Sequence, residues 1–206
     1  MKISSVIRRS ACFLSVLSVL GAVYAQNVPQ QELDQFNKER VNITKHGMYA
    51  LGGWAVANFA VSGVGWARGS GSNKYFHMGN VLWNTVNLGL AVPGIVRSYR
   101  TGTQGMTWAK TLKAQSGAEK LFLFNAGLDV GYVMGGLAMR EFGKNVKHRG
   151  RVLDGLGNSL MLQGAFLLLF DSGMFLAHHI HLKRRLYKPF PELTFTGNGF
   201  YYRKLF

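Results

Sequence analysis

Four long runs of mostly apolar residues dominate the chain. They cover about residues 46–67, 75–96, 121–139 and 152–180. The first two contain no Asp, Glu, Lys or Arg, and each is about 20 residues long, which is the length that ~30 Å of hydrocarbon requires. The third contains Asp129 and the fourth contains Asp154 and Asp171, so these two fit a membrane less well. The pattern predicts an all-α fold, a four-helix transmembrane bundle, with a soluble bundle of buried helices as the alternative.

The first 25 residues have the features of a secretory signal. A basic start is followed by an apolar stretch and by a small-residue cleavage site that ends at Ala25. We therefore predict a signal peptide at 1–25 that is removed, the alternative being an uncleaved anchor helix. The only cysteine, Cys12, lies in this segment, so the mature chain is expected to hold no disulfide and no thiolate ligand.

The rest of the chain divides by composition into three parts. A polar N-terminal tail at 26–45 precedes the membrane domain at 46–182, and a basic, aromatic C-terminal tail follows at 183–206. Gly197, Asn198 and Gly199 lie between two short runs rich in aromatic residues, which favours a hairpin in that tail.

The chain is strongly basic, with 24 Lys and Arg against 9 Asp and Glu. These charges lie in short segments between the apolar runs, where anionic lipid headgroups are the expected partner rather than nucleic acid. A protein partner or a homo-oligomer remains open. The signal peptide places the tail after Ala25 outside, whereas the excess of basic residues on that side favours the opposite orientation. The sequence does not decide between the two.

The second apolar run carries an unusual polar face. His77, Asn80, Asn84 and Asn87 fall within an arc of about 80° on a helical projection. Polar groups facing lipid are unfavourable, so this face is expected to turn toward the other helices. Polar positions that could meet it on those helices are Trp54, Asn58, Asn125, Asp129, Tyr132, Asp154 and Asn158.

Alternating helix directions allow the depths of these residues to be compared. At ~1.5 Å per residue, three pairs come out at matching levels: Asn58 with Asn84, Asn87 with Asp129, and His77 with Asp154. The pattern predicts interhelical hydrogen bonds, with His77 and Asp154 in contact. An ion path, a proton path or a ligand pocket through Asp129 is the functional alternative, because ionisable groups inside membranes often mark such sites.

Two further patterns invite interpretation. Asp171, His178 and His181 have a spacing that could bind a divalent metal, although an interfacial cluster of polar residues is the favoured interpretation. Small residues recur every four positions at Gly127, Gly131 and Gly135 and at Gly53 and Ala57, which predicts close helix packing at those glycines.

The segments GMYALGGWAVANF and KYFHMGNVLWNTVN together resemble a family of small uncharacterised bacterial multi-pass membrane proteins, which is defined as a domain of unknown function. The resemblance covers about residues 40–180 and implies a multi-helix membrane domain without a known activity. We expect a protein of a bacterial cell (inner) membrane that acts as a binding, transport-associated or assembly component. The alternative is a membrane-embedded enzyme or a haem- or metal-binding protein. The sequence identifies neither a catalytic residue nor a cofactor.

Overall fold

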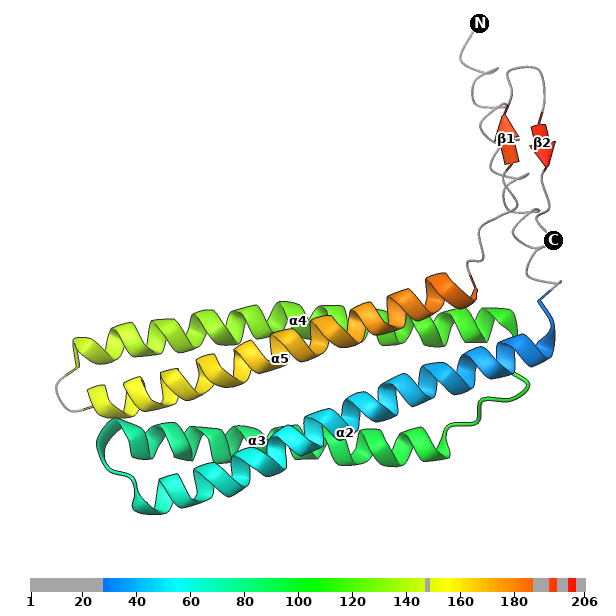
Figure 1. The fold of residues 1–206 in the computed structure, drawn as a ribbon. Helices are drawn as coiled ribbons and strands as arrows, with labels where there is room; N and C mark the ends of the chain where they lie inside the picture. The colour runs from blue at the N-terminus through cyan, green and yellow to red at the C-terminus, as the bar shows by residue number, and fades with distance from the viewer. Residues whose placement is uncertain (1–27, 147–148, 187–192, 196–199, 203–206) are drawn as a thin grey trace, which may run out of the picture.

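The computed structural model describes residues 28–146, 149–186, 193–195 and 200–202. Within these residues lie four long helices, α2 (Gln30–Arg68), α3 (Gly71–Arg100), α4 (Trp108–Lys144) and α5 (Gly150–Arg185), and two short strands, β1 (Leu193–Phe195) and β2 (Phe200–Tyr202) (Figure 1). The strands pair antiparallel, in agreement with the expected hairpin. The all-α fold is confirmed, whereas the segment predicted as a signal peptide lies outside the described residues.

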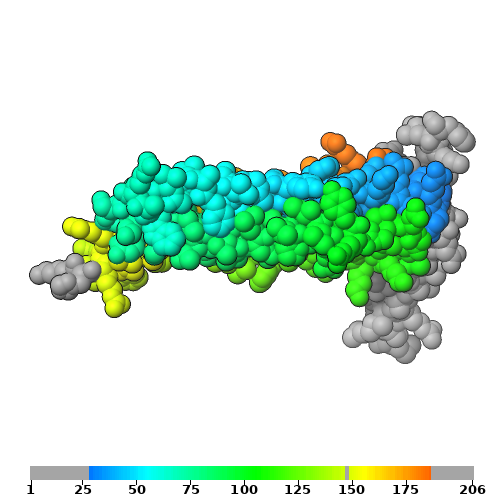
Figure 2. Space-filling model, turned by 90° about the horizontal axis from the view of Figure 1, so that it is seen from below, coloured from blue at the N-terminus to red at the C-terminus, as the bar shows by residue number. Residues whose placement is uncertain are grey.

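The helices form two antiparallel hairpins, α2 with α3 and α4 with α5 (Figure 1). The hairpins pack together mainly through α3 and α5, and α2 also crosses α5. The connection between α3 and α4 is held against the start of α2, because the Gly105 N–H donates to Asp34 Oδ1 at 2.9 Å. Gly105 has a φ of +68°, a conformation that favours glycine. Seen from below, the helices form a long, narrow body (Figure 2).

The helices are longer than the apolar runs predicted. The segment 30–45, interpreted as a polar tail, is helical from Gln30, and α5 continues to Arg185, past the predicted domain boundary at 183. Helices of 36 and 39 residues are about 54–59 Å long, well beyond ~30 Å of hydrocarbon. The periodicity of apolar residues missed these ends because they are rich in charge.

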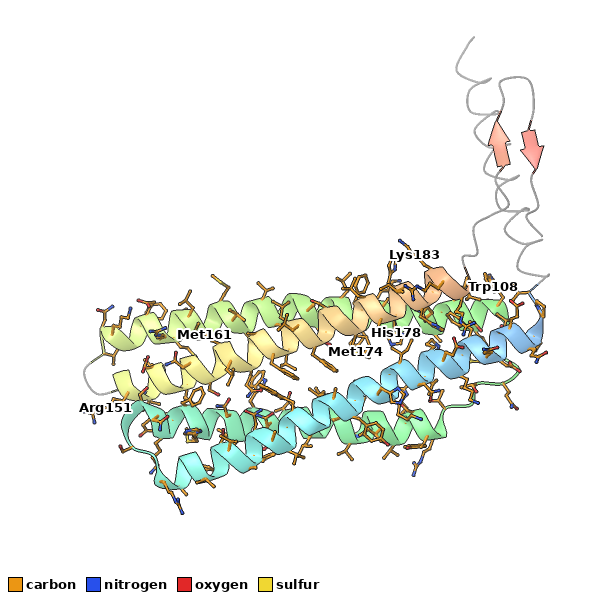
Figure 3. The ribbon with its side chains drawn as sticks, in the orientation of Figure 1. Trp108, Arg151, Met161, Met174, His178 and Lys183 are labelled. Atoms are coloured by element: carbon orange, nitrogen blue, oxygen red, sulfur yellow. The ribbon has the colours of Figure 1, made fainter. Side chains whose placement is uncertain are left out.

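The two ends of the bundle differ in character. We call residues 30–46, 97–120 and 178–186 the basic end, and residues 68–74 and 140–154 the turn end. Figure 3 shows Trp108 and Lys183 at the basic end and Arg151 at the turn end. The basic end has an apolar core of its own, in which Leu33, Phe36 and Leu186 are buried against each other.

Apolar side chains cover the outside of the bundle between the two ends. Val56 on α2, Leu82 on α3 and Leu169 on α5 are 59%, 57% and 77% exposed. Further exposed large apolar residues on the same part of the helices are Val61, Val64, Val86, Leu90, Leu121, Leu123, Phe124, Val130, Met134 and Leu176. The bundle thus presents apolar groups outward over much of its length.

Close packing of α4 against α5 depends on glycines other than those predicted. A Cβ added at Gly136 would lie 2.6 Å from the carbonyl oxygen of Gly157, so only glycine fits there. At Gly127 and Gly131 an added Cβ would meet nothing within 4 Å. At Gly135 an added Cβ would meet only the Leu160 side chain, at 3.8 Å. The prediction of close packing is therefore wrong for Gly127 and Gly131, because the repeat lies one position away from Gly136, where α4 closely contacts α5. Gly53 is equally open.

Candidate functional site

Gln163 on α5 is the centre of a hydrogen-bonded network that joins three helices. Its Nε2 donates to Asn80 Oδ1 on α3 at 2.7 Å and to Asn58 Oδ1 on α2 at 3.4 Å. Its Oε1 accepts from Trp54 Nε1 at 3.0 Å and from Asn87 Nδ2 at 3.4 Å. The side chain is fully buried, and these four contacts use both of its N–H groups and both lone pairs.

Asparagines along α3 extend this network. Asn84 Nδ2 donates to the Asn80 carbonyl oxygen at 2.7 Å, and Asn84 Oδ1 accepts from Asn87 Nδ2 at 3.0 Å. Asn80 Oδ1 also accepts from Ser159 Oγ on α5 at 3.1 Å. All four residues are buried, so this polar face does turn inward. We call the set the amide network: Trp54, Asn58, Asn80, Asn84, Asn87, Ser159 and Gln163.

Two members of the amide network were missed from the sequence. Ser159 and Gln163 lie in the fourth apolar run, in which the polar positions predicted to face α3 were Asp154 and Asn158. A signal was present, because Ser159 and Gln163 are one helical turn apart and follow Asn158 in a stretch without charge. Gln163 supplies the polar partner on α5 that the face of α3 requires.

His77 faces α2. Its Nδ1 lies 3.3 Å from Ser62 Oγ, and its ring packs over Gly65, where an added Cβ would overlap the imidazole. The ring also makes an edge contact with Phe76. His77 therefore fills a gap left by a glycine in the α2–α3 hairpin.

Asp154 has partners other than the predicted His77. It accepts hydrogen bonds from Ser72 Oγ and, at 3.3 Å, from Asn158 Nδ2, and Arg140 Nε lies 3.7 Å from its Oδ1. The predicted contact with His77 is not formed, because the imidazole of His77 is directed to Ser62 on α2 while Asp154 bonds to Ser72 on α3 and Asn158 on its own helix.

Asp129 on α4 and Asp171 on α5 form a buried acid pair. Their carboxyl groups share a hydrogen bond, and Asn125 also bonds to Asp171. The two aspartates are only 2% and 5% exposed, and Asp129 Oδ2 has no partner among the described residues. One turn along α4, Tyr132 makes an edge contact with Trp83 of α3. The predicted polar face of this helix thus meets α5 through its acid and α3 through its tyrosine.

The three residues considered as metal ligands lie apart. Asp171 belongs to the acid pair, whereas His178 Nε2 lies 3.2 Å from Thr44 Oγ1 on α2. His181 Nε2 lies 3.2 Å from the Phe36 carbonyl oxygen, and its ring stacks on the Phe36 ring. Burial lowers the pKa of His181 in spite of that hydrogen bond. Across the described ranges, no three His, Cys, Asp or Glu side chains are grouped to hold a metal ion.

The fold and the site together define a helical-bundle protein with a polar interior and an apolar exterior. Among the described residues, the two helices that are long and apolar enough to cross a membrane are α4 and α5. They contain the third and fourth apolar runs, whereas the sequence had favoured the first two. The chain belongs to the family described as Family of unknown function (DUF6992), whose sequence profile matches residues 50–172. That range contains the amide network and the acid pair, and it ends before His178. No curated protein matches the chain. No solved structure matches it either.

Proposed function

We propose that this chain is an integral membrane protein in which all four helices cross the bilayer. The observation that carries the proposal is the reversal of polarity between its inside and outside. Asn84 and Gln163 are 0% exposed, while Val56 and Leu169 are 59% and 77% exposed. In water such an arrangement would leave a large apolar surface unprotected. In lipid, the apolar groups have a matching solvent and the amides bond to each other.

The distribution of charge along the helices supports four spans. Residues 47–67 of α2 and 75–96 of α3 contain no Asp, Glu, Lys or Arg. Residues 121–139 of α4 contain one charged residue, Asp129, and residues 155–177 of α5 also contain one, Asp171. These are the two members of the acid pair. These four stretches lie side by side in the bundle, and about 20 residues of helix cross ~30 Å of hydrocarbon. Only 22% of the residues in the apolar stretch of α4 and 28% in that of α5 are buried inside the protein, so these are not core helices of the soluble kind.

Within this membrane domain, we assign the acid pair to a binding role. Two carboxylates in contact repel each other and would not both stay ionised away from water, so the pair is suited to hold a proton or a small cation. The unpartnered Oδ2 of Asp129 is an open acceptor for it. The protein then acts as a binding or transport-associated component. The alternative is a membrane-embedded enzyme or a haem- or metal-binding protein.

The remaining features of the proposal concern location. The sequence of residues 1–25 supports export by a signal peptide into a bacterial cell membrane, and the basic end would contact anionic headgroups. Four spans place the start of α2 and the end of α5 on the same side. A homo-oligomer is compatible with the apolar exterior.

Single cysteines and a membrane-impermeant maleimide test the four spans. In a variant with Cys12→Ser, we expect Thr103→Cys and Asn145→Cys to be labelled from opposite sides of sealed vesicles. Val56→Cys and Leu82→Cys should react only after detergent is added. Labelling of Val56→Cys or Leu82→Cys in intact vesicles would contradict the membrane placement.

A hydrophobic carbodiimide tests the acid pair, because this reagent modifies protonated carboxyl groups in membranes. We expect a mass adduct on Asp129 or Asp171 that decreases as pH rises or as sodium is added. The matched control is Asp154, which has an arginine partner at the turn end and should stay unmodified. Absence of an adduct on the pair would contradict the binding role. An absorption spectrum and a metal analysis of the same purified protein would reveal haem or metal if the alternative holds.

A further inference from the structure

Arg40 lies inside the basic end and has no acidic partner. The residue is 9% exposed, and its Nε and Nη2 both donate to Asn37 Oδ1, at 3.3 and 3.2 Å. Within the described part of the chain, no carboxylate lies within 4.0 Å of the guanidinium. Burial lowers the pKa of Arg40, yet a guanidinium stays charged in proteins. A buried charge with only a neutral amide for a partner is strongly unfavourable.

The nearby carboxylates are engaged elsewhere. Glu39 bonds to Arg185, and its other oxygen lies 3.6 Å from His181 Nδ1. Glu119 accepts from a glutamine of its own helix and lies 3.7 Å from His179 Nδ1. Neither acid is therefore free to neutralise the arginine.

Two other buried side chains beside Arg40 each have one polar atom without a partner among the described residues. His178 and Gln115 are 0% exposed, and His178 Nδ1 and Gln115 Oε1 make no hydrogen bond with any described residue. Gln115 Nε2 donates to the His178 carbonyl oxygen at 2.7 Å, so the two residues are neighbours. Thr44 Oγ1 bonds to both the Arg40 carbonyl oxygen and His178 Nε2. An unpaired cation, an unpaired imidazole nitrogen and an unpaired amide oxygen thus gather where α2, α4 and α5 meet. Figure 3 shows His178 on the part of α5 that faces α2.

The surroundings favour a negatively charged ligand. The basic end contains eleven Lys and Arg against four Asp and Glu. Such an excess of one sign raises the local concentration of anions and guides them to the surface. Arg40 lies one to two turns outside the uncharged part of α2, the level at which lipid headgroups are expected if the helices cross a bilayer.

We propose that Arg40, His178 and Gln115 form a binding site for a phosphate group that carries an O–H or N–H donor. Three of the five guanidinium N–H groups remain for phosphate oxygens, which this planar fork can bind in pairs. Because the Thr44 hydroxyl donates its one proton to the Arg40 carbonyl oxygen, it accepts from His178 Nε2, which leaves His178 Nδ1 as an acceptor. His178 Nδ1 and Gln115 Oε1 can therefore only accept, and both require an O–H or N–H donor on the ligand.

Two sources offer this chemistry. One is a lipid headgroup such as phosphatidylglycerol, whose glycerol hydroxyls are donors. The other is free hydrogen phosphate. The lipid source rests on the membrane placement proposed above, whereas the site itself does not, because its three groups are present in the folded bundle whatever surrounds it.

Titration of the purified full chain in an uncharged detergent tests the site. The probes are inorganic phosphate, phosphatidylglycerol and phosphatidylcholine, whose headgroup has no donor, with binding followed by native mass spectrometry and by the shift in thermal unfolding. We expect one saturable site that prefers phosphatidylglycerol to phosphatidylcholine by at least about tenfold, the equivalent of one hydrogen bond to a charged group. Saturation by inorganic phosphate, without competition from lipid, would identify the free anion as the ligand and would leave the site valid even if the membrane placement failed. Absence of saturable binding by any probe would overturn the proposal.

Arg40→Gln is the central variant, and Lys113→Gln is its matched control, since Lys113 is an exposed cation of the same end. We expect Arg40→Gln to weaken binding at least about tenfold and Lys113→Gln to change it less than about twofold. Without ligand, Arg40→Gln should be no less stable than the native protein, because it removes an uncompensated buried charge. If Arg40→Gln does not fold, Arg40→Lys retains the charge without the fork and should weaken binding to a similar extent. Equal losses in Arg40→Gln and Lys113→Gln, or unchanged affinity in Arg40→Lys, would show that only the general surface charge attracts the anion.

Discussion

Replacing Gln163 by leucine should destabilise the bundle, because this residue connects α2 and α3 to α5. The magnitude follows from its four contacts. Two of them are short, to Asn80 at 2.7 Å and from Trp54 at 3.0 Å, and two lie at 3.4 Å, near the limit of a hydrogen bond. At roughly 0.6–1.7 kcal/mol for each good interhelical bond in a membrane, the two short contacts contribute about 1–3 kcal/mol. The Trp54 indole N–H would lose its partner, whereas Asn80 Oδ1 would still accept from a serine.

We therefore expect Gln163→Leu to lower the free energy of unfolding by about 2–3 kcal/mol. The measurement is a denaturant titration in detergent micelles, followed by far-UV circular dichroism. Thr85→Leu is the control, because Thr85 is exposed and bonds only to the backbone of its own helix; its effect should stay within about 0.5 kcal/mol. In the double variant with Asn80→Leu, the loss should be smaller than the sum of the single losses, since the two residues share one bond.

An unfolding free energy for Gln163→Leu equal to that of the native protein, or higher, would refute this reasoning. It would mean that the amide side chains find equivalent hydrogen-bond partners when the helices are apart, or that the leucine side chain packs well enough between the helices to replace the hydrogen bonds of Gln163. The amide network would then have to be explained by specificity of helix pairing rather than by stability.

Two further predictions concern packing and pH. Gly136→Ala should be less stable than Gly127→Ala by about 1–3 kcal/mol, because the added methyl group meets the backbone of α5 only in the first case; equal melting temperatures for the two variants would contradict the packing described. Burial lowers the pKa of His181 from its ordinary value of 6.5, so the unfolded chain binds the proton more tightly and stability should fall as pH decreases below about 6.5. His181→Gln should reduce that fall in melting temperature between about pH 7 and pH 5, and an identical pH profile in the variant would count against it.

The sequence predicted the helical class and the inward polar face because both depend on periodicity. Apolar runs of sufficient length and the spacing of Asn80, Asn84 and Asn87 are local properties of one helix. The matching of Asn58 with Asn84 is also consistent with the hairpin of α2 and α3, since a short turn fixes the register of two antiparallel helices. The contacts of Gly65 with His77 and of Gly52 with Ala91 agree with that register.

Contacts between the hairpins could not be predicted in the same way. The parallel packing of α3 against α5 depends on which glycines and serines allow close approach, as Gly79 does beside Ser159. The side-chain direction of His77 toward Ser62 and the bond of Asp154 with Ser72 were not visible in the depth comparison, which paired Asp154 with the wrong residue. The partner of Asp129 is Asp171, a residue that its spacing along a single helix had marked only as a candidate metal ligand.

The charged extension of α2, α4 and α5 at the basic end gives one molecule two kinds of interior. Between the two ends, where the outer surface is apolar, amide hydrogen bonds hold the helices together. At the basic end, Leu33, Phe36 and Leu186 pack as in a soluble protein. The first 17 residues of α2 would project about 25 Å into water. Urea and cold weaken apolar packing in water, whereas under the proposed membrane placement lipid would shield the amide hydrogen bonds. The projecting end would then open while the membrane domain stays closed, and the single helix α2 would join a part that solvent can unfold to a part that it cannot.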